Sequence, residues 1–157
     1  KINTTIFESS TINTPSLLCI EDFIDTLEWS KNLGGLKTLI NLSQSNLDIM
    51  LDWVSSHSWI EFLSERKETI SSTSVCLKFS SLITNKLNIL NQNKLEKLIV
   101  DLLDEEKIAY DIGSYRSAPP GFRIWCGPTI LAKDLKRFLP WLNWAFEKSS
   151  KKIMENA

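Results

Sequence analysis

The spacing of apolar residues changes along the chain, and this change restricts the fold to a mixture of helices and a sheet. Apolar residues three or four apart are typical of an amphipathic helix, whereas alternation is typical of a strand with one buried face. The helical spacing predicts helices at 15–33, 36–56, 93–106 and 132–150. Short or alternating apolar runs predict strands at 58–63, 74–80, 108–113 and 122–127. The resulting order, α-α-β-β-α-β-β-α, predicts an α+β domain in which helices pack on an antiparallel or mixed sheet.

Capping residues and a proline give further expectations about the helix ends. Thr14 is expected to cap the first helix, with Pro15 at its first helical position. Asn93 is expected to cap the third helix, with Glu96 three residues later in a capping motif. Pro140 lies inside the last predicted helix, which it should kink or divide in two.

The composition argues against several classes of function. The 157 residues carry a net charge of −1 with both signs interspersed, so neither nucleic acid nor a membrane is an expected partner. No apolar run approaches the ~20 residues that span a bilayer, and no signal peptide is recognisable. The single histidine, His57, follows a predicted helix, and no Cys/His cluster occurs, so neither a histidine-dependent hydrolase nor a metal site is expected. Three well-separated cysteines indicate free thiols in a cytoplasmic protein.

Two arginines lie close together in the sequence "SYRSAPPGFRIWCG". Arg116 and Arg123 flank a Pro-Pro-Gly bend, and the alternation after it puts Phe122 and Ile124 on one face of a strand and Arg123 on the other. A buried arginine needs a partner, because an unpaired buried charge is costly. That partner is either an acidic residue of the chain or an external carboxylate or phosphate, to which a guanidinium binds in bidentate fashion.

The sequence "TINTPS" offers a second candidate anion site. A helix N-terminus presents unpaired backbone N–H groups and the positive end of the helix dipole. Asn13 and Thr14 would add side-chain donors at this position. When these residues are taken alone, an ordinary helix cap is the favoured explanation.

Taken together and in order, these segments resemble a known family. The sequences "TINTPSLLCIEDFIDTLEWSKNLGGL", "SSTSVCLKF" and "YRSAPPGFRIWCGPTILAKDLKRFLPWLNWAF" closely resemble the C-terminal part of the phosphoserine aminotransferase family, fold-type I enzymes that use pyridoxal phosphate. The resemblance covers residues 11–146. It implies that residues 1–33 are the end of a large domain with its connecting helix, and that residues 34–157 form a small C-terminal α+β domain. A first residue other than Met agrees with a piece of a longer enzyme.

The resemblance also implies roles for the candidate residues. Enzymes of this family are homodimers with active sites at the subunit interface. Asn13 and Thr14 match the residues that bind the phosphate of the cofactor, pyridoxal 5'-phosphate, in the neighbouring subunit's site. Arg123 matches the arginine that holds the substrate α-carboxylate, and Arg116 matches one that helps to bind the substrate's phosphate or side-chain carboxylate. Tyr115 occupies the place of a histidine in a better known branch, and its hydroxyl can replace one hydrogen bond.

The implied reaction exchanges an amino group between glutamate and 3-phosphohydroxypyruvate, which gives phosphoserine and 2-oxoglutarate. In the family the Schiff-base lysine lies upstream of everything present here, so no catalytic residue is expected in this chain, and the chain alone should not transaminate. Two alternatives stay open. One is another aminotransferase of the same class that acts on alanine or serine with glyoxylate, and the other is a non-catalytic α+β binding module.

Overall fold

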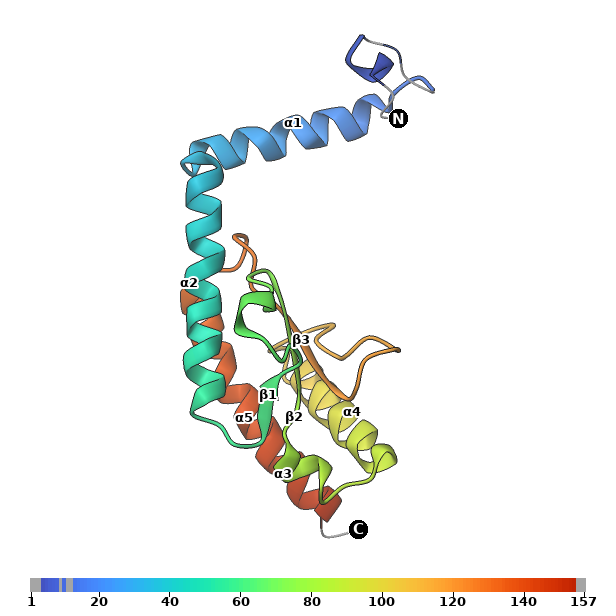
Figure 1. Ribbon diagram of the computed structural model, residues 1–157, viewed down its shortest axis with the longest axis vertical. Coiled ribbons are helices and arrows are strands. Elements are labelled where there is room, and N and C mark those ends of the chain that lie inside the picture. The colour runs from blue at the N-terminus through green and yellow to red at the C-terminus, as the bar shows by residue number, and fades with distance from the viewer. Residues whose placement is uncertain (1–3, 9, 11–12, 155–157) are drawn as a thin grey trace. The chain divides into compact units, whose positions relative to one another are not determined.

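The computed structural model of the chain describes residues 4–8, 10 and 13–154 (Figure 1). The chain divides into two compact units, Lys1–Leu39 and Ile40–Ala157. No helix among the described residues is both long and apolar enough to cross a membrane.

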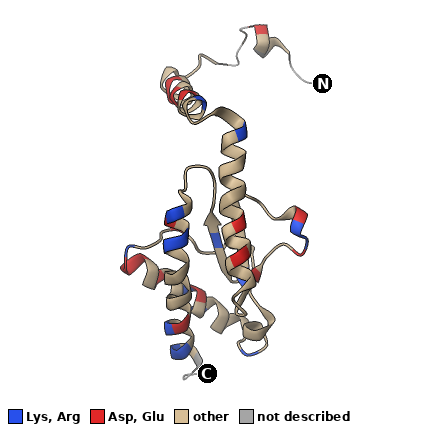
Figure 2. Ribbon diagram, turned by 90° about the vertical axis from the view of Figure 1, so that its left-hand side faces the viewer, with Lys and Arg blue, Asp and Glu red and all other residues tan. Residues whose placement is uncertain are grey.

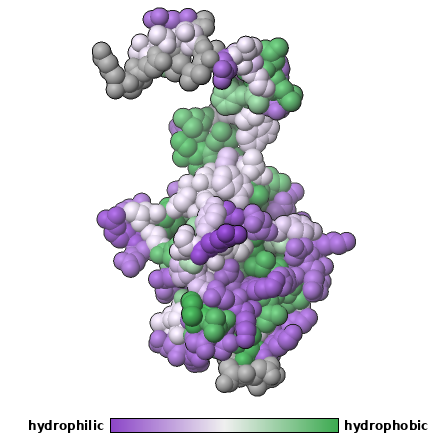
Figure 3. All heavy atoms as spheres, turned by 90° about the vertical axis from the view of Figure 1, so that its right-hand side faces the viewer, coloured by the Kyte–Doolittle hydropathy of each residue, from purple (hydrophilic) through white to green (hydrophobic). Residues whose placement is uncertain are grey.

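The first unit contains the short 3-10 helix η1 (Thr5–Glu8) and helix α1 (Leu17–Asn32). Helix α1 begins two residues later than predicted, because the side chain of Ser16, rather than that of Thr14, accepts a hydrogen bond from the backbone N–H of Cys19 at 3.4 Å. Its end is as predicted, since Gly34 and Gly35 both have positive φ angles. No residue of α1 is buried, and several of its large apolar side chains are exposed; Figure 3 shows green, hydrophobic atoms at the surface beside purple, hydrophilic ones. The exposed apolar side chains of α1 are Leu17, Leu18, Ile20, Phe23, Ile24, Leu27 and Trp29.

Helix α2 (Gly35–Ser55) agrees closely with the second predicted helix. Its C-terminal half has a buried stripe at the expected spacing of three and four residues. That stripe consists of Ser43, Asn46, Leu47, Met50 and Val54. Two of these five residues are polar, and the side chain of Asn46 is only 1% exposed. This face of α2 therefore buries polar groups as well as apolar ones.

The sheet of the second unit has three antiparallel strands in the order β1-β2-β3. They are β1 (Ile60–Phe62), β2 (Ser74–Phe79) and β3 (Gly121–Trp125), with the 3-10 helix η2 (Lys67–Thr69) between the first two. The prediction of a further strand at 108–113 is wrong. Lys107 and Asp111 have φ angles of 58° and 53°, which a strand does not accommodate, and this segment makes only a single bridge, from Gly113 to Phe122.

Among its described residues, the second unit also contains the helices α3 (Ser81–Thr84), α4 (Ile89–Glu105) and α5 (Ala132–Met154). Helix α4 begins earlier than predicted, because Asn88 rather than Asn93 caps it by accepting a hydrogen bond from the N–H of Asn91 at 2.9 Å. Helix α5 is one element, and Pro140 does not divide it. The proline ring is exposed, and buried side chains on both sides of it, among them Leu139 and Leu142, hold the helix on the core.

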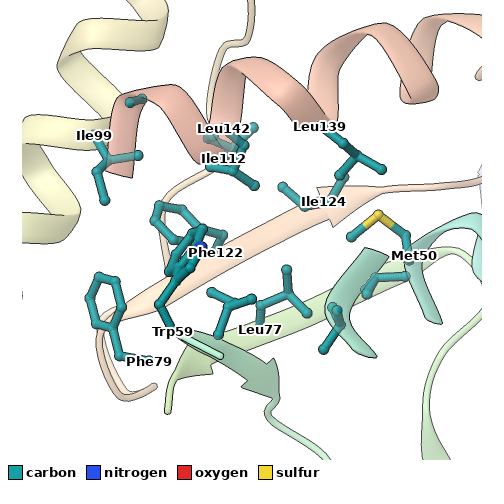
Figure 4. Close-up of a cluster of buried hydrophobic side chains, with 14 of the residues drawn as sticks. Met50, Trp59, Leu77, Phe79, Ile99, Ile112, Phe122, Ile124, Leu139 and Leu142 are labelled. Carbon is teal, nitrogen blue, oxygen red and sulfur yellow. The ribbon is translucent and has the colours of Figure 1, made fainter. Parts of the chain in front are cut away.

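The core lies between the sheet and helices α2, α4 and α5 (Figure 4). Trp59 is at its centre, stacked on Phe146 with ring centroids 4.0 Å apart, and its indole N–H donates to Asn143 Oδ1 at 3.0 Å. Phe79 and Phe122 meet edge to face. The predicted fold class is therefore confirmed: an α+β unit with helices packed on an antiparallel sheet, in which one predicted strand is an irregular segment.

Candidate functional site

Arg123 lies on β3, at the edge of the sheet, where the strand alternation determines its direction. Phe122 and Ile124 are 1% and 4% exposed and point into the core. Arg123 and Trp125 therefore lie on the opposite face, as the sequence predicts. The backbone N–H of Arg123 donates to the carbonyl of Ile112 at 2.8 Å, which holds the irregular segment 108–113 alongside the strand.

The guanidinium group of Arg123 has partners within the chain. It donates to the hydroxyl of Tyr115, and its Nη2 donates to a carboxylate oxygen of Asp111 at 3.0 Å and to the Asp111 carbonyl at 3.3 Å. Its Cζ also lies 4.3 Å from the centroid of the Tyr115 ring, a cation–π distance. The hydrogen bond that Arg123 donates to Tyr115 and, to a smaller extent, the charge of Asp111 raise the pKa of Arg123, against an opposing effect of desolvation.

Within the chain, the charged partner of Arg123 is an acidic residue, Asp111. Asp111 reaches the arginine because its own backbone is in the left-handed region, which turns both its carbonyl and its carboxylate toward Arg123. The side chain of Asp111 is 92% exposed, whereas that of Arg123 is 23% exposed. The ion pair is thus open to solvent on the carboxylate side, and a ligand can approach the guanidinium from there.

An open pocket of about 520 Å³ lies beside this ion pair. Arg123 and Asp111 form part of its wall, together with Tyr110, Trp125 and Asp134. The rest of the wall is mostly apolar and comes from the segment 108–112, from β3 and the loop after it, and from α5, with Ser74 of β2 as a polar exception. Its size falls within the range of about 300–1,000 Å³ typical of small-molecule sites. Arg123 is the one cation among these lining residues, and the carboxylates of Asp111 and Asp134 lie on the same wall.

Arg116 lies on the loop between the bridge at Gly113 and the start of β3. The N–H of Ala118 donates to the carbonyl of Tyr115 at 2.9 Å, so that Arg116 occupies a central position of a tight turn. The side chain of Arg116 is exposed and lines a second, more polar pocket of about 350 Å³. Tyr115 also lines that pocket and contacts Arg123, so it connects the neighbourhoods of the two arginines, which line separate pockets.

A residue that the sequence did not single out for this site, Glu96 on α4, anchors the loop. Its carboxylate accepts hydrogen bonds from the backbone N–H of Ser114 at 2.8 Å and from the backbone N–H of Gly121 at 3.1 Å. The Ser114 hydroxyl lies 2.9 and 3.1 Å from the two carboxylate oxygens. The interpretation of Glu96 as part of a helix cap is therefore wrong, since the helix begins seven residues earlier. No sequence signal reveals such a role, because two of its donors are backbone groups.

Asn13 and Thr14 are both described and both exposed, directly ahead of the Ser16 cap of α1. They belong to the first unit, whereas the arginines belong to the second. An amide and a hydroxyl beside a helix N-terminus are donors that suit a phosphate group. Charged residues of both signs are interspersed along the described chain, as Figure 2 shows.

Comparison with known proteins gives a consistent answer. No protein-family model matches the chain. It is 49% identical over 94% of its length to the curated phosphoserine aminotransferase of Methanosarcina mazei, and 49% identical over 93% of its length to that of Methanosarcina barkeri. The chain is related to the C-terminal part of these phosphoserine aminotransferases. It spans 37% of the length of each, and the predicted resemblance is confirmed.

Solved structures agree in fold. The phosphoserine aminotransferase of Bacillus circulans subsp. alkalophilus superposes with a TM-score of 0.72 at 16% identity, over 92% of this chain and 37% of that one. A second phosphoserine aminotransferase structure gives a TM-score of 0.72 at 18% identity, over the same shares of both chains. At such low identity these structures show a shared fold, which supports the α+β assignment.

Proposed function

We propose that this chain is the C-terminal part of a phosphoserine aminotransferase that exchanges an amino group between glutamate and 3-phosphohydroxypyruvate. The observation that carries the proposal is the 49% identity to curated phosphoserine aminotransferases over 94% of the chain. Residues 1–33 would be the end of the large domain with its connecting helix, and residues 34–157 the small domain. The proposed enzyme is a cytoplasmic homodimer that binds neither nucleic acid nor membrane.

Arg123 is proposed to bind the α-carboxylate of the substrate. Its surroundings support this role in two ways. The guanidinium group already contacts a carboxylate, that of Asp111, and it borders a pocket large enough for a small amino acid. Tyr115 holds the guanidinium group through a hydrogen bond and through its ring face, which limits the orientations that the group can adopt.

Arg116 is proposed to bind the second anionic group, which is the phosphate of phosphoserine or the side-chain carboxylate of glutamate. Its exposure in a polar pocket, on the rigid turn before Pro119 and Pro120, supports this role. Tyr115, next to it in sequence, has a phenolic hydroxyl that can add one hydrogen bond. Two arginines on either side of one tyrosine suit a ligand with an anionic group at each end.

The cofactor of the proposed enzyme is pyridoxal 5'-phosphate. When bound, it supplies the electron sink that the reaction requires. In this chain, Asn13 and Thr14 would hold its phosphate in the neighbouring subunit's site. Their donor chemistry fits, because an amide and a hydroxyl are exposed ahead of the first turn of α1, where backbone N–H groups lack helical partners. No lysine of this chain is assigned a catalytic role, so the proposal includes that the 157-residue chain alone does not transaminate.

Alanine substitution of Arg116 in the full-length enzyme tests the proposal. Arg116→Ala should weaken binding of phosphoserine by about 2–5 kcal/mol if the bound substrate buries the charge pair, because the phosphate then loses its charged partner. The measurement is KM for phosphoserine with 2-oxoglutarate as acceptor. Arg66→Ala, which removes an exposed arginine near η2, is the matched control and should leave KM unchanged.

Two results would count against the proposal. If Arg116→Ala left KM for phosphoserine unchanged while alanine or serine was transaminated with glyoxylate, the enzyme would belong to the alternative substrate class. Turnover by the purified 157-residue chain would contradict the assignment of all catalytic residues to the rest of the enzyme.

A further inference from the structure

The carboxylate of Glu96 is the acceptor for both ends of the loop that carries Tyr115 and Arg116. The Ser114 N–H lies 2.8 Å from Oε1, and the Gly121 N–H lies 3.1 Å from Oε2. The Ser114 hydroxyl reaches both oxygens, at 2.9 and 3.1 Å. All these donors are neutral, and charge-assisted hydrogen bonds of this kind are shorter and stronger than bonds between neutral groups.

Glu96 thereby joins the two ends of the loop. Ser114 and Gly121 bracket the loop residues 115–120, and one side chain on α4 fixes the backbone at both positions. Between them the turn from Tyr115 to Ala118 adds a bond of 2.9 Å, and Pro119 and Pro120 restrict the backbone further. The place of Arg116 relative to β3 therefore depends on Glu96, although Glu96 itself is half-buried behind the loop.

Building on the proposed function, we propose that Glu96 is a positioning residue that sets the site for the distal anion of the substrate. It acts through the loop by holding Tyr115 and Arg116 where the phosphate or side-chain carboxylate binds. Glu96→Gln tests this, because the variant keeps the side-chain length but replaces one acceptor oxygen by an NH₂ group that cannot accept from Ser114 or Gly121. A freed loop misplaces Arg116, and misplacements of about 1 Å can cost on the order of 100-fold.

The experiment uses the full-length enzyme with phosphoserine and 2-oxoglutarate. Glu96→Gln should raise KM for phosphoserine by about 10- to 100-fold and leave kcat within about two-fold, because the loop positions substrate and does not take part in the chemistry. Hydrogen exchange of the Ser114 and Gly121 amides should become faster. Ser114→Ala removes only the hydroxyl contact and should raise KM less. Glu105→Gln, an exposed residue at the end of α4, is the matched control.

A double variant separates positioning from general destabilisation. If Glu96 acts through the loop that carries Arg116, Glu96→Gln combined with Arg116→Ala should raise KM by much less than the product of the two single effects. If Glu96→Gln and Ser114→Ala lowered kcat at unchanged KM while Arg116→Ala still had a raised KM, the positioning role of Glu96 would be overturned. The role of Arg116 would stand. If Arg116→Ala itself had normal KM, the proposed function of that arginine would fail first.

Discussion

Asn46 offers the sharpest test of how the second unit is held together. Its side chain is 1% exposed, and its amide donates to the carbonyls of Cys126, Gly127 and Ile130 at 3.1, 3.4 and 3.0 Å. This single residue ties α2 to the loop that follows β3. A buried carbonyl that loses its donor costs about 1–3 kcal/mol, so the two shorter bonds predict that Asn46→Leu destabilises the unit by roughly 2–6 kcal/mol. That is a large part of the ~5–15 kcal/mol by which a typical domain is stable.

Urea unfolding of the 157-residue chain, followed by tryptophan fluorescence, measures this loss. With a slope of about 2 kcal/mol/M, the midpoint should fall by about 1–3 M. Leucine has the same branched skeleton of heavy atoms as asparagine, so the change removes the donors without opening a cavity. Asn41→Leu on the exposed side of α2 is the control and should shift the midpoint little. If Asn46→Leu unfolded at the same urea concentration as the unchanged chain, the three hydrogen bonds would not contribute as argued.

Two further predictions concern Gly121 and Cys126. A Cβ at Gly121 would overlap the Leu77 carbonyl and lie 2.8 Å from the Cα of Lys78, so Gly121→Ala should lower the free energy of unfolding by at least ~1–3 kcal/mol in urea titrations; a neutral result would refute the close approach of β2 and β3. Burial raises the pKa of Cys126 from 9.0 to about 12, so iodoacetamide at pH 8 should modify the exposed Cys19 and not Cys126 in the folded chain, as mass spectrometry can check. Because the folded state keeps this proton longer than the unfolded state, the contribution of Cys126 to stability is complete below pH 9 and is lost as the pH rises toward 12; preferential labelling of Cys126 would contradict both points.

The strand faces and the second helix could be predicted from the sequence, because burial on one side imposes a repeat that residue types reveal. Phe122 and Ile124 are buried and Arg123 is not, as the alternation predicts. The apolar stripe of α1 predicted a helix equally well, but a stripe says nothing about what covers it, and in this chain its side chains are exposed.

The parts that could not be predicted depend on backbone groups and backbone angles. Asp111 and Lys107 adopt the left-handed region without being glycine, so the sequence in this segment resembles a strand although none forms. Glu96 binds two backbone N–H groups, and every residue type except proline offers such a group. The ion pair between Arg123 and Asp111 follows from that backbone conformation, and for this reason the sequence left the partner of Arg123 undecided.

The exposed carboxylate of Asp111 has a consequence for the role proposed for Arg123, because a bound anion would have to take the place of Asp111. An anion that binds this guanidinium group replaces an ion pair already present, so its measured affinity is a difference between two similar contacts. Salt screens both the ion pair with Asp111 that is lost and the ion pair with the ligand that forms. The affinity should therefore depend only weakly on ionic strength. Selectivity among anions would then depend less on their charge than on how well the rest of each ligand fits the pocket, because Asp111 offers the same charge without those further contacts.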